Sequence, residues 1–334
     1  MQSINISKRK YESLKPIELP KSVISTEAKF YKMPYLKKVK VFKNLYKTNG
    51  PIFANKLFTL EMLNEYREIL PESFVLPEAL CSVDKEVKGF VLPYIQGVTL
   101  EDYLSNRKNN PQDQLSYIAK IGDILDQMAH IRKNSALDSI YLNDLHASNF
   151  IIDAKKKDLR VVDLDSCRIC DAKPFPARYL HPFSLLNRAP GENKYDIYKK
   201  ELIGPDGIPI MNFSLSDEAY DEYEKEYCKY KNYRDELGFV NSNENSDLYC
   251  YVILFLNYLY GGNVGSFTLE KFYEYMYYLE YLNFDSELLS AIHLILTGAP
   301  NKNIGPYLET VTDEQVARAH ENVYKAAKSK KLVF

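Results

Sequence analysis

The stretch from 142 to 165 constrains this chain more than any other, because it combines an apolar hairpin pattern with carboxylate and amide side chains at both ends. Asp144 and Asn149 precede the first apolar segment, and Asp163 follows the second. Short apolar runs around a polar turn predict a β-hairpin. The expected strands are 150–152 and 159–162, with a turn at 153–158. Antiparallel pairing brings the start of one strand beside the end of the other, so we expect these polar side chains to line one cleft.

In order and spacing, these three residues resemble the catalytic loop and metal-binding strand of the protein-kinase-like superfamily. In that family an Asp orients the attacking hydroxyl, an Asn on the same loop binds a metal ion, and a second Asp holds the metal that bridges the phosphates. The resemblance gives these roles to Asp144, Asn149 and Asp163, in that order. It implies ATP as the phosphoryl donor and Mg²⁺, or alternatively Mn²⁺, as the metal.

A second segment, 90–100, resembles the strand, hinge and helix start that contact adenine in the same family. The resemblance places Leu92 at the gatekeeper position. Pro93 has no N–H, but the hinge requires only its carbonyl to accept a hydrogen bond, while the Ile95 N–H would donate to the ring. A strand end followed by an ordinary turn is the alternative interpretation.

A third segment, Ser246-Asp247, resembles the start of the central helix of the large lobe. In that family the Asp accepts hydrogen bonds from the backbone of the catalytic loop. The same two residues would also serve as an ordinary helix N-cap, and the two interpretations are compatible. The resemblance extends over about residues 25–310 of the chain.

The lysine that binds phosphate is expected in the strand pattern around 38–43. The local sequence of apolar-Lys-apolar-apolar favours Lys40, with Lys43 as the second choice. The family pairs this lysine with a Glu on the following helix, but Asn55-Lys56 occupy the expected position. Glu61, one and a half turns later, is the expected substitute. Solvated surface positions are the alternative for each of these charged residues.

Several residues depart from the family pattern. No glycine precedes Gly50, so no Gly-rich loop covers the phosphates, and the turn near 25–29 is expected to replace it. Leu142-Asn143 replaces the usual His-Arg, so we expect activity that does not depend on phosphorylation of the activation segment. Asp165 follows Asp-Leu where the family has Gly. It is a candidate ligand of a second metal, and ending the strand is its alternative role.

His146 stands where protein kinases usually have Lys. Kinases of small molecules, such as those of the aminoglycoside and choline type, commonly have His at this position. We therefore expect His146 to contact the transferring phosphoryl group or the acceptor.

The length and the order of patterns predict two lobes. The chain has 334 residues, which exceeds the roughly 150 of a typical domain. Residues 23–92 show strand, helix and strand patterns, whereas amphipathic helices dominate afterwards. Together with the resemblance, this predicts an α+β, two-lobed protein-kinase-like fold. The expected parts are an arm at 1–22, a small lobe with an antiparallel sheet and one helix at 23–94, and a mainly helical large lobe at 95–334. The large lobe would include an activation or substrate segment at 166–245 with a helix at 217–237.

Charge and cysteine content restrict the partners and the compartment. The formal net charge is −2, although residues 1–47 carry twelve Lys and Arg against three Glu. Such a basic region can bind nucleic acid or acidic lipid, but we expect a solvated sheet rim near phosphates and no nucleic-acid partner. Five scattered cysteines and no secretory signal predict a cytoplasmic protein without disulfides. No apolar run approaches the ~20 residues that cross a bilayer.

The expected function is transfer of the ATP γ-phosphoryl group to a hydroxyl, in the first place a Ser or Thr of a protein. The large-lobe helix favours a protein acceptor, whereas His146 and the Asp163-Leu164-Asp165 sequence favour a small-molecule acceptor. A nucleotide-binding pseudokinase is the alternative of a different class. The missing glycine loop and the unclear Lys–Glu pair support it, and the complete set of Asp144, Asn149 and Asp163 opposes it.

Overall fold

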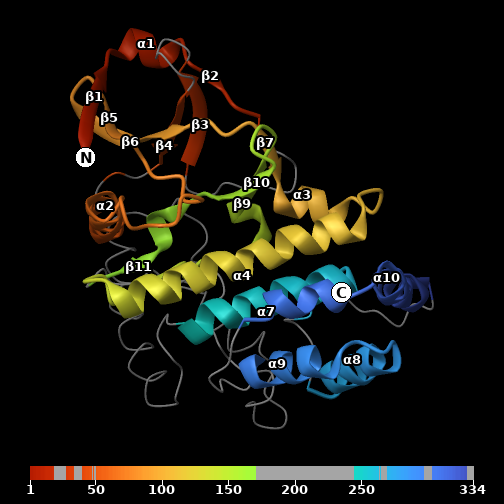
Figure 1. Ribbon diagram of the computed structural model, residues 1–334. Coiled ribbons are helices and arrows are strands. Elements are labelled where there is room, and N and C mark those ends of the chain that lie inside the picture. Colours follow the sequence, from red (N-terminus) through yellow and green to blue (C-terminus); the bar gives the residue numbers. More distant parts are fainter. Residues whose placement is uncertain are drawn as a thin grey trace, which may run out of the picture.

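The computed structural model describes residues 1–18, 28–33, 40–46, 48, 50–170, 244–262, 264, 269–296 and 303–328. The helix expected at 217–237, most of the segment 166–245 and the first part of the turn at 25–29 lie outside the described residues. Within them, a small, mainly antiparallel sheet forms the N-terminal part, and helices form most of the C-terminal part (Figure 1). The architecture is therefore mixed α+β.

Six strands form the N-terminal sheet in the order β1-β5-β6-β4-β3-β2. Their bounds are β1 (Gln2–Ile6), β2 (Lys15–Pro16), β3 (Ala28–Met33), β4 (Lys40–Leu45), β5 (Ala79–Val83) and β6 (Glu86–Pro93). All neighbours pair antiparallel except β1 and β5, which are parallel. On β4 the alternation of side chains sends Phe42 into one apolar cluster, while Leu45 joins the other. The sheet is thus covered on both faces, and β4 runs through its middle.

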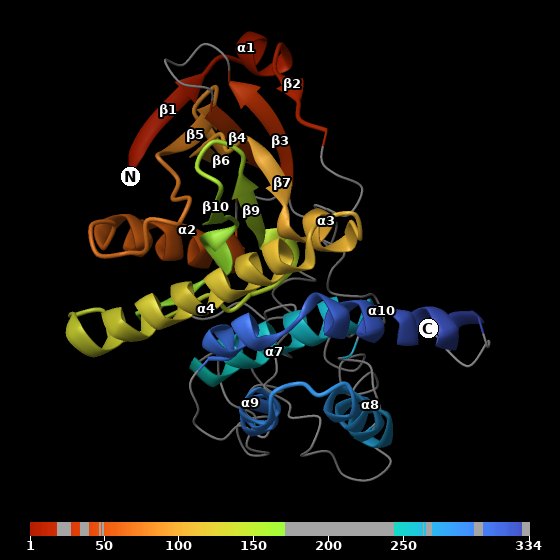
Figure 2. The same ribbon diagram turned by 45° about the vertical axis from the view of Figure 1, so that its right-hand side comes forward.

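The first residues of the chain are part of this sheet rather than an arm. The helix α1 (Lys8–Glu12) follows β1 and leads to β2, so the chain passes from one edge of the sheet to the other (Figures 1 and 2). Ile6, Leu14, Met33 and Phe42 pack in one buried cluster there. The alternation of Ile4 and Ile6 with polar residues is a strand signal too short to separate from an extended arm.

The helix α2 (Gly50–Glu65) connects β4 to the rest of the sheet. The helical spacing of Leu57, Leu60, Leu63 and Tyr66 predicts a helix from 53 to 70, but α2 ends five residues earlier, in a turn that precedes Pro71. Leu60 and Leu63 are buried, and the ring of Phe53 stacks on that of Phe90 with centroids 6.2 Å apart. The apolar side of α2 therefore packs against the sheet face opposite α1.

The predicted hairpin is confirmed as β9 (Phe150–Asp153) and β10 (Asp158–Val161). Its register places Phe150 opposite Val161, and β7 (Gly97–Thr99) adds a third strand beside β9. Gly97 is required for this approach, because a Cβ there would lie 2.0 Å from the Ile152 carbonyl oxygen. A second pair, β8 (Ile140–Tyr141) with β11 (Arg168–Ile169), flanks the hairpin in sequence. The β8–β11 pair thus holds the two ends of the segment 142–167 together, and the hairpin lies between them.

The helical part is built around two long helices that lie side by side, α4 (Pro111–Asn134) and α7 (Glu244–Tyr260) (Figures 1 and 2). Asn110 caps α4, and Pro111 fills its first turn, where no N–H is needed. The side chains 247–256 of α7 are all buried, as expected for a helix that is apolar on every side. Four further helices lie in the described residues of this part, namely α3 (Leu100–Ser105), α8 (Leu269–Tyr281), α9 (Ser286–Leu296) and α10 (Asp313–Lys328).

Among the described residues, no helix combines the length and the apolar character that a membrane span needs. The described cysteines, Cys81, Cys167, Cys170 and Cys250, are free thiols.

Candidate functional site

The loop between β8 and β9 is held by a carboxylate from α7. The Leu142 and Asn143 N–H groups donate to the two oxygens of Asp247 over 2.9 and 3.1 Å, and the Asp247 side chain is buried. A buried carboxylate with two N–H donors keeps its charge satisfied. Because α7 begins at Glu244, Asp247 lies inside the first turn and is not the N-cap. Of the two interpretations of Asp247, the bond to the loop is therefore the one observed.

Asn143 fixes the same loop from the other side. Its backbone has φ of 64°, a left-handed conformation that Asn tolerates better than most residues. Its buried side chain donates to the Ser166 carbonyl over 3.0 Å. The loop that carries Asp144 is thereby tied to the segment that follows Asp163.

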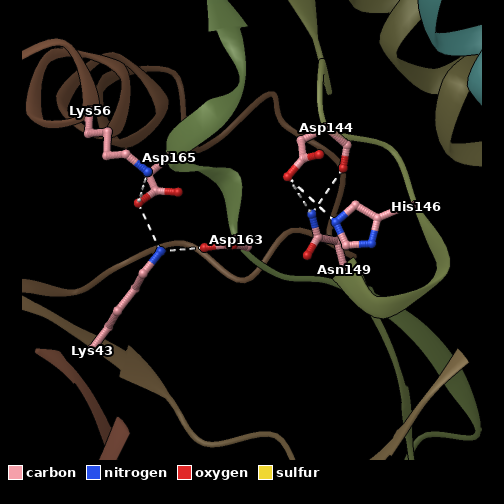
Figure 3. A network of polar contacts seen from close by, with 7 residues as sticks. All are labelled: Lys43, Lys56, Asp144, His146, Asn149, Asp163 and Asp165. Carbon is pink, nitrogen blue, oxygen red and sulfur yellow. Dashed lines mark hydrogen bonds and ion pairs between the residues drawn. The ribbon is translucent and has the colours of Figure 1, made fainter. Parts of the chain in front are cut away.

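Asp144, His146 and Asn149 lie together on this loop (Figure 3). The Asn149 amide donates to the Asp144 carbonyl over 2.9 Å and to its carboxylate oxygen Oδ2 over 3.2 Å. His146 Nε2 lies 3.5 Å from the same Oδ2. The Asp144 side chain keeps 19 % exposure, so one carboxylate is oriented by its neighbours and still partly open to an incoming group.

Asp163 lies directly after β10, beside Asn149. The Val162 N–H donates to the Asn149 carbonyl over 2.9 Å, which joins the two ends of the hairpin. Asp163 itself has φ of 61° and ψ of 44°. A left-handed backbone conformation is uncommon for residues other than glycine. Where it occurs, it is often at a functional site. It turns the chain away from the strand and lets the Asp163 side chain reach β4.

Lys43 on β4 meets Asp163 and Asp165 (Figure 3). Its ammonium group forms an ion pair with Asp163 Oδ1 and lies 2.9 Å from Asp165 Oδ2. Lys56 on α2 reaches the same Asp165 oxygen over 3.3 Å. Burial alone would raise the pKa of the Asp165 carboxyl, but the two ammonium groups outweigh it and hold that pKa well below its ordinary value. The cluster therefore contains two cations and two carboxylates.

The other two charged residues expected near the phosphates lie elsewhere. Lys40 forms an ion pair with Glu78. Glu61 is exposed on α2, and in the described part of the chain it forms no ion pair with Lys43. Lys43, the second choice from the sequence, is thus the lysine that the structure places beside Asp163. The acids that face it are Asp163 and Asp165.

The residues expected to contact adenine lie at the end of β6 and just beyond it. Leu92 and Pro93 pair with Val41 and Lys40 of β4, and Ile95 follows in the connection to β7. All three side chains are partly buried. Leu92 and Pro93 are therefore on the strand next to the one that carries Lys43, and Ile95 lies just beyond the end of that strand.

Sequence reasoning did not assign a role to Lys56. Its position four residues before Leu60 and seven before Leu63 was a usable signal, because these spacings share one face of a helix. A lysine on a face that is otherwise buried must have a charged partner. Sequence reasoning also did not connect Ser148 with Glu101 of α3, whose side chains form a hydrogen bond.

The side chains of Asp163 and Asn149 can be tested for their fit to a metal ion by the chemistry of their oxygen atoms. Among the described residues, no three His, Cys, Asp or Glu side chains gather in a metal-binding group. Asp163 and Asn149 offer a carboxylate and an amide oxygen, which are hard ligands that suit Mg²⁺. Mg²⁺ is usually bound by one or two carboxylates together with substrate phosphates. Asp163 and Asn149 therefore fit a metal that a nucleotide brings.

No protein-family model matches the chain, and a comparison with curated proteins also finds no match.

Proposed function

We propose that the chain is a phosphotransferase with a protein-kinase-like, two-lobed fold, which transfers the γ-phosphoryl group of ATP to a hydroxyl. The ion pair between Lys43 and Asp163 carries the proposal. These residues are 120 positions apart in the sequence, on β4 and after β10. A cation suited to phosphate oxygens and a carboxylate suited to Mg²⁺ therefore share one place. Asn149 adjoins them through the hydrogen bond between Val162 and Asn149.

The roles follow from the needs of phosphoryl transfer, in which the protein mainly positions groups and neutralises charge. Asp144 would accept the hydrogen bond of the attacking hydroxyl, since its carboxylate is oriented by Asn149 and partly exposed. Lys43 would exchange its contact with Asp163 for phosphate oxygens. Asp163 and Asn149 would hold Mg²⁺, which neutralises the charge of the phosphates when it is bound.

Two features outside the charged cluster support the proposal. The β4 strand that carries Lys43 lies between β3 and β6, with the hinge-like segment at the end of β6. Asp247 of α7 binds the backbone just before Asp144. The resemblance implies a hinge within the segment 90–100 and a bond from Asp247 to the backbone of the loop.

Ser or Thr of a protein is the first candidate acceptor. A small-molecule hydroxyl is the second, and one observation favours it. His146 Nε2 lies 3.5 Å from the Asp144 carboxylate, so an imidazole ring stands where the acceptor would be oriented. Labelling of proteins by radioactive ATP, compared with labelling of a panel of amino-alcohols and sugars, separates the two.

The proposal is tested by ATP consumption with Mg²⁺. We expect Asp163→Asn and Asp144→Asn each to lower turnover by about 100-fold or more, because each removes a charge that acts on the reacting groups. Asp158→Asn is the matched control and should keep wild-type turnover. Asp158 lies at the start of β10, far from Asp163, and forms an exposed ion pair with Lys120. If the wild type consumes no ATP with any acceptor, the catalytic role is wrong. Stabilisation by ADP without turnover would then identify a pseudokinase.

A further inference from the structure

Asp165 lies in the most enclosed part of the charged cluster. Its side chain and those of Lys43 and Lys56 have exposures of 3, 6 and 4 %. Both ammonium groups bind the same oxygen, Oδ2, over 2.9 and 3.3 Å. With Asp163 included, two positive and two negative charges balance. A buried charge is tolerated only when it is paired in this way.

This arrangement does not fit Asp165 as a metal ligand, although the sequence suggested that role. Oδ2 already receives two cations, and a divalent ion beside them would be repelled. The other oxygen, Oδ1, is shielded from solvent and has no hydrogen-bond partner among the described residues. Mg²⁺ gives up its waters reluctantly and usually keeps several of them. A hydrated ion would therefore have to open the cluster to reach Asp165.

The same contacts join three separate parts of the fold. Lys43 comes from β4, Lys56 from α2, and Asp165 from the turn after β10 (Figure 3). A second contact links α2 to this turn, since the Thr59 hydroxyl lies 3.5 Å from the Cys167 carbonyl oxygen. The position of α2 is thus coupled to the position of the Lys43 ammonium group through one carboxylate.

We propose that Asp165 is a positioning residue that holds Lys43 toward the nucleotide phosphates and, through Lys56, ties α2 to that arrangement. The proposal rests on the proposed function, because it assumes that Lys43 meets a nucleotide. If Asp163 were to hold Mg²⁺, Asp165 would remain as the acid that fixes Lys43. Lys56 stands on α2, where the resemblance implies a Glu. The negative charge beside Lys43 comes instead from Asp165, in the turn after β10.

The test measures ADP affinity by calorimetry at several Mg²⁺ concentrations for Asp165→Asn, Lys56→Met and the double variant. We expect Asp165→Asn to weaken ADP binding about tenfold, the usual effect of losing one charge-assisted hydrogen bond. Lys56→Met should weaken it less. The double variant should match Asp165→Asn alone, because Lys56 acts through Asp165. The Mg²⁺ concentration at half-maximal binding should stay that of the wild type in all three variants.

Three results would overturn the proposal. A higher Mg²⁺ requirement in Asp165→Asn but not in Lys56→Met would identify a metal ligand. Losses that multiply in the double variant would show that Lys56 acts independently of Asp165. Unchanged ADP affinity in Asp165→Asn would leave only a structural role. Lys120→Met, which removes an exposed ion pair with Asp158, is the control and should bind ADP as the wild type does.

A second measurement separates this proposal from the proposed function. Urea unfolding and amide exchange of α2 need no nucleotide. We expect Asp165→Asn to be the least stable variant, since it leaves two buried lysines against one acid. In the double variant the charges balance again, because the one remaining lysine, Lys43, is paired with Asp163. This variant should therefore recover part of the lost stability. If the wild type does not bind ADP, the proposed function fails. If the double variant recovers nothing, the link between Lys56 and Asp165 fails.

Discussion

Gly89 on β6 shows how one missing side chain determines the position of Lys43. A Cβ at this residue would lie 1.9 Å from the Lys43 carbonyl oxygen, and its φ is 151°. Side chains rarely permit this conformation, and a backbone atom cannot yield as a flexible side chain would. The close pairing of β4 and β6 at Lys43 therefore requires glycine at position 89.

We predict that Gly89→Ala lowers the free energy of unfolding by at least about 2 kcal/mol, from backbone strain and displacement of β4. Urea denaturation measures this loss. Gly262→Ala is the control, because its Cβ would first meet the Tyr260 ring at 3.3 Å, and a ring can shift. Equal losses in the two variants would show that the approach to Lys43 is not the cause.

The choice between Lys40 and Lys43 shows what the sequence could and could not decide. Both lysines lie on the predicted strand, and they face opposite sides of the sheet because they are three residues apart. The local pattern favoured Lys40. Which face of the sheet lies beside Asp163 depends on where α2 and the hairpin pack. That packing is set by contacts between residues about 120 positions apart in the sequence. Asp144, Asn149 and Asp163 were easier to group, because one hairpin connects them.

At the scale of elements, the bond between α7 and the loop before Asp144 is the best-defined long-range contact of the site. Asp247 uses one oxygen for each of two N–H donors. An Asn in its place could accept only one of these hydrogen bonds, and its NH₂ group would face the second N–H.

We predict that Asp247→Asn lowers the free energy of unfolding by about 2 kcal/mol, the penalty for an unsatisfied buried donor. It should also slow ATP turnover, because the loop carries Asp144. Asp285→Asn is a matched control. A single Asp285 oxygen accepts both the Glu287 and the Leu288 N–H groups at the start of α9, so Asn can replace it. A loss at position 285 as large as that at 247 would contradict this account.

The contact between α10 and α7 introduces a pH dependence. Burial lowers the pKa of His320 below its ordinary value, although its hydrogen bond to the Tyr258 carbonyl, 2.9 Å long, opposes this effect. Arg107 adds to the lowering. The unfolded chain therefore binds the proton more tightly than the folded protein does. Stability should fall as the pH drops below the ordinary pKa of His, and this contribution should level off below the folded value.

We predict that unfolding free energy, measured in urea between pH 7.5 and 5.5, falls less steeply in His320→Gln than in the wild type. The difference in slope is limited to about 1.4 kcal/mol per pH unit, the value for one proton. Parallel curves for the two proteins would exclude His320 as the source.

Elements with strong periodicity were predictable, and those defined by distant partners were not. The apolar spacing from Leu115 to Lys133 predicts a helix, and α4 matches it within a few residues, as the β9–β10 hairpin matches the strands expected at 150–152 and 159–162. The apolar segment from Phe74 to Ala79 predicts a strand, but β5 begins only at Ala79, because the Ser73 carbonyl and the Val75 N–H form hydrogen bonds with the backbone of Val161 instead. The α2 helix ends at Glu65 rather than at Leu70, because residues 66–70 form a turn before Pro71.

At the scale of the whole molecule, the sheet encloses an apolar cluster that depends on the first residues of the chain. Met33 and Phe42 are fully buried there, and Ile6 and Leu14 cover them. The sequence alone did not predict this closure, because short strands such as β1 and β2 carry too few residues for a clear pattern.

We predict that Ile6→Ala lowers the free energy of unfolding by about 2 kcal/mol or more, the usual cost of such a cavity. Thermal or urea unfolding measures it. Ile4→Ala, at a partly buried position of the same strand, should cost less. If neither substitution changes stability, β1 contributes nothing to the fold.

The other edge of the sheet has a consequence for how molecules of this protein meet one another. The edge strand β2 consists of two exposed residues, Lys15 and Pro16. An open edge normally offers a row of N–H and C=O groups to which a second chain can add by strand pairing, and such addition is a route to aggregation. Proline has no N–H to offer, and a lysine would have to lose water to be covered. Among the described residues, the strand at this edge therefore offers a neighbouring copy little to pair with.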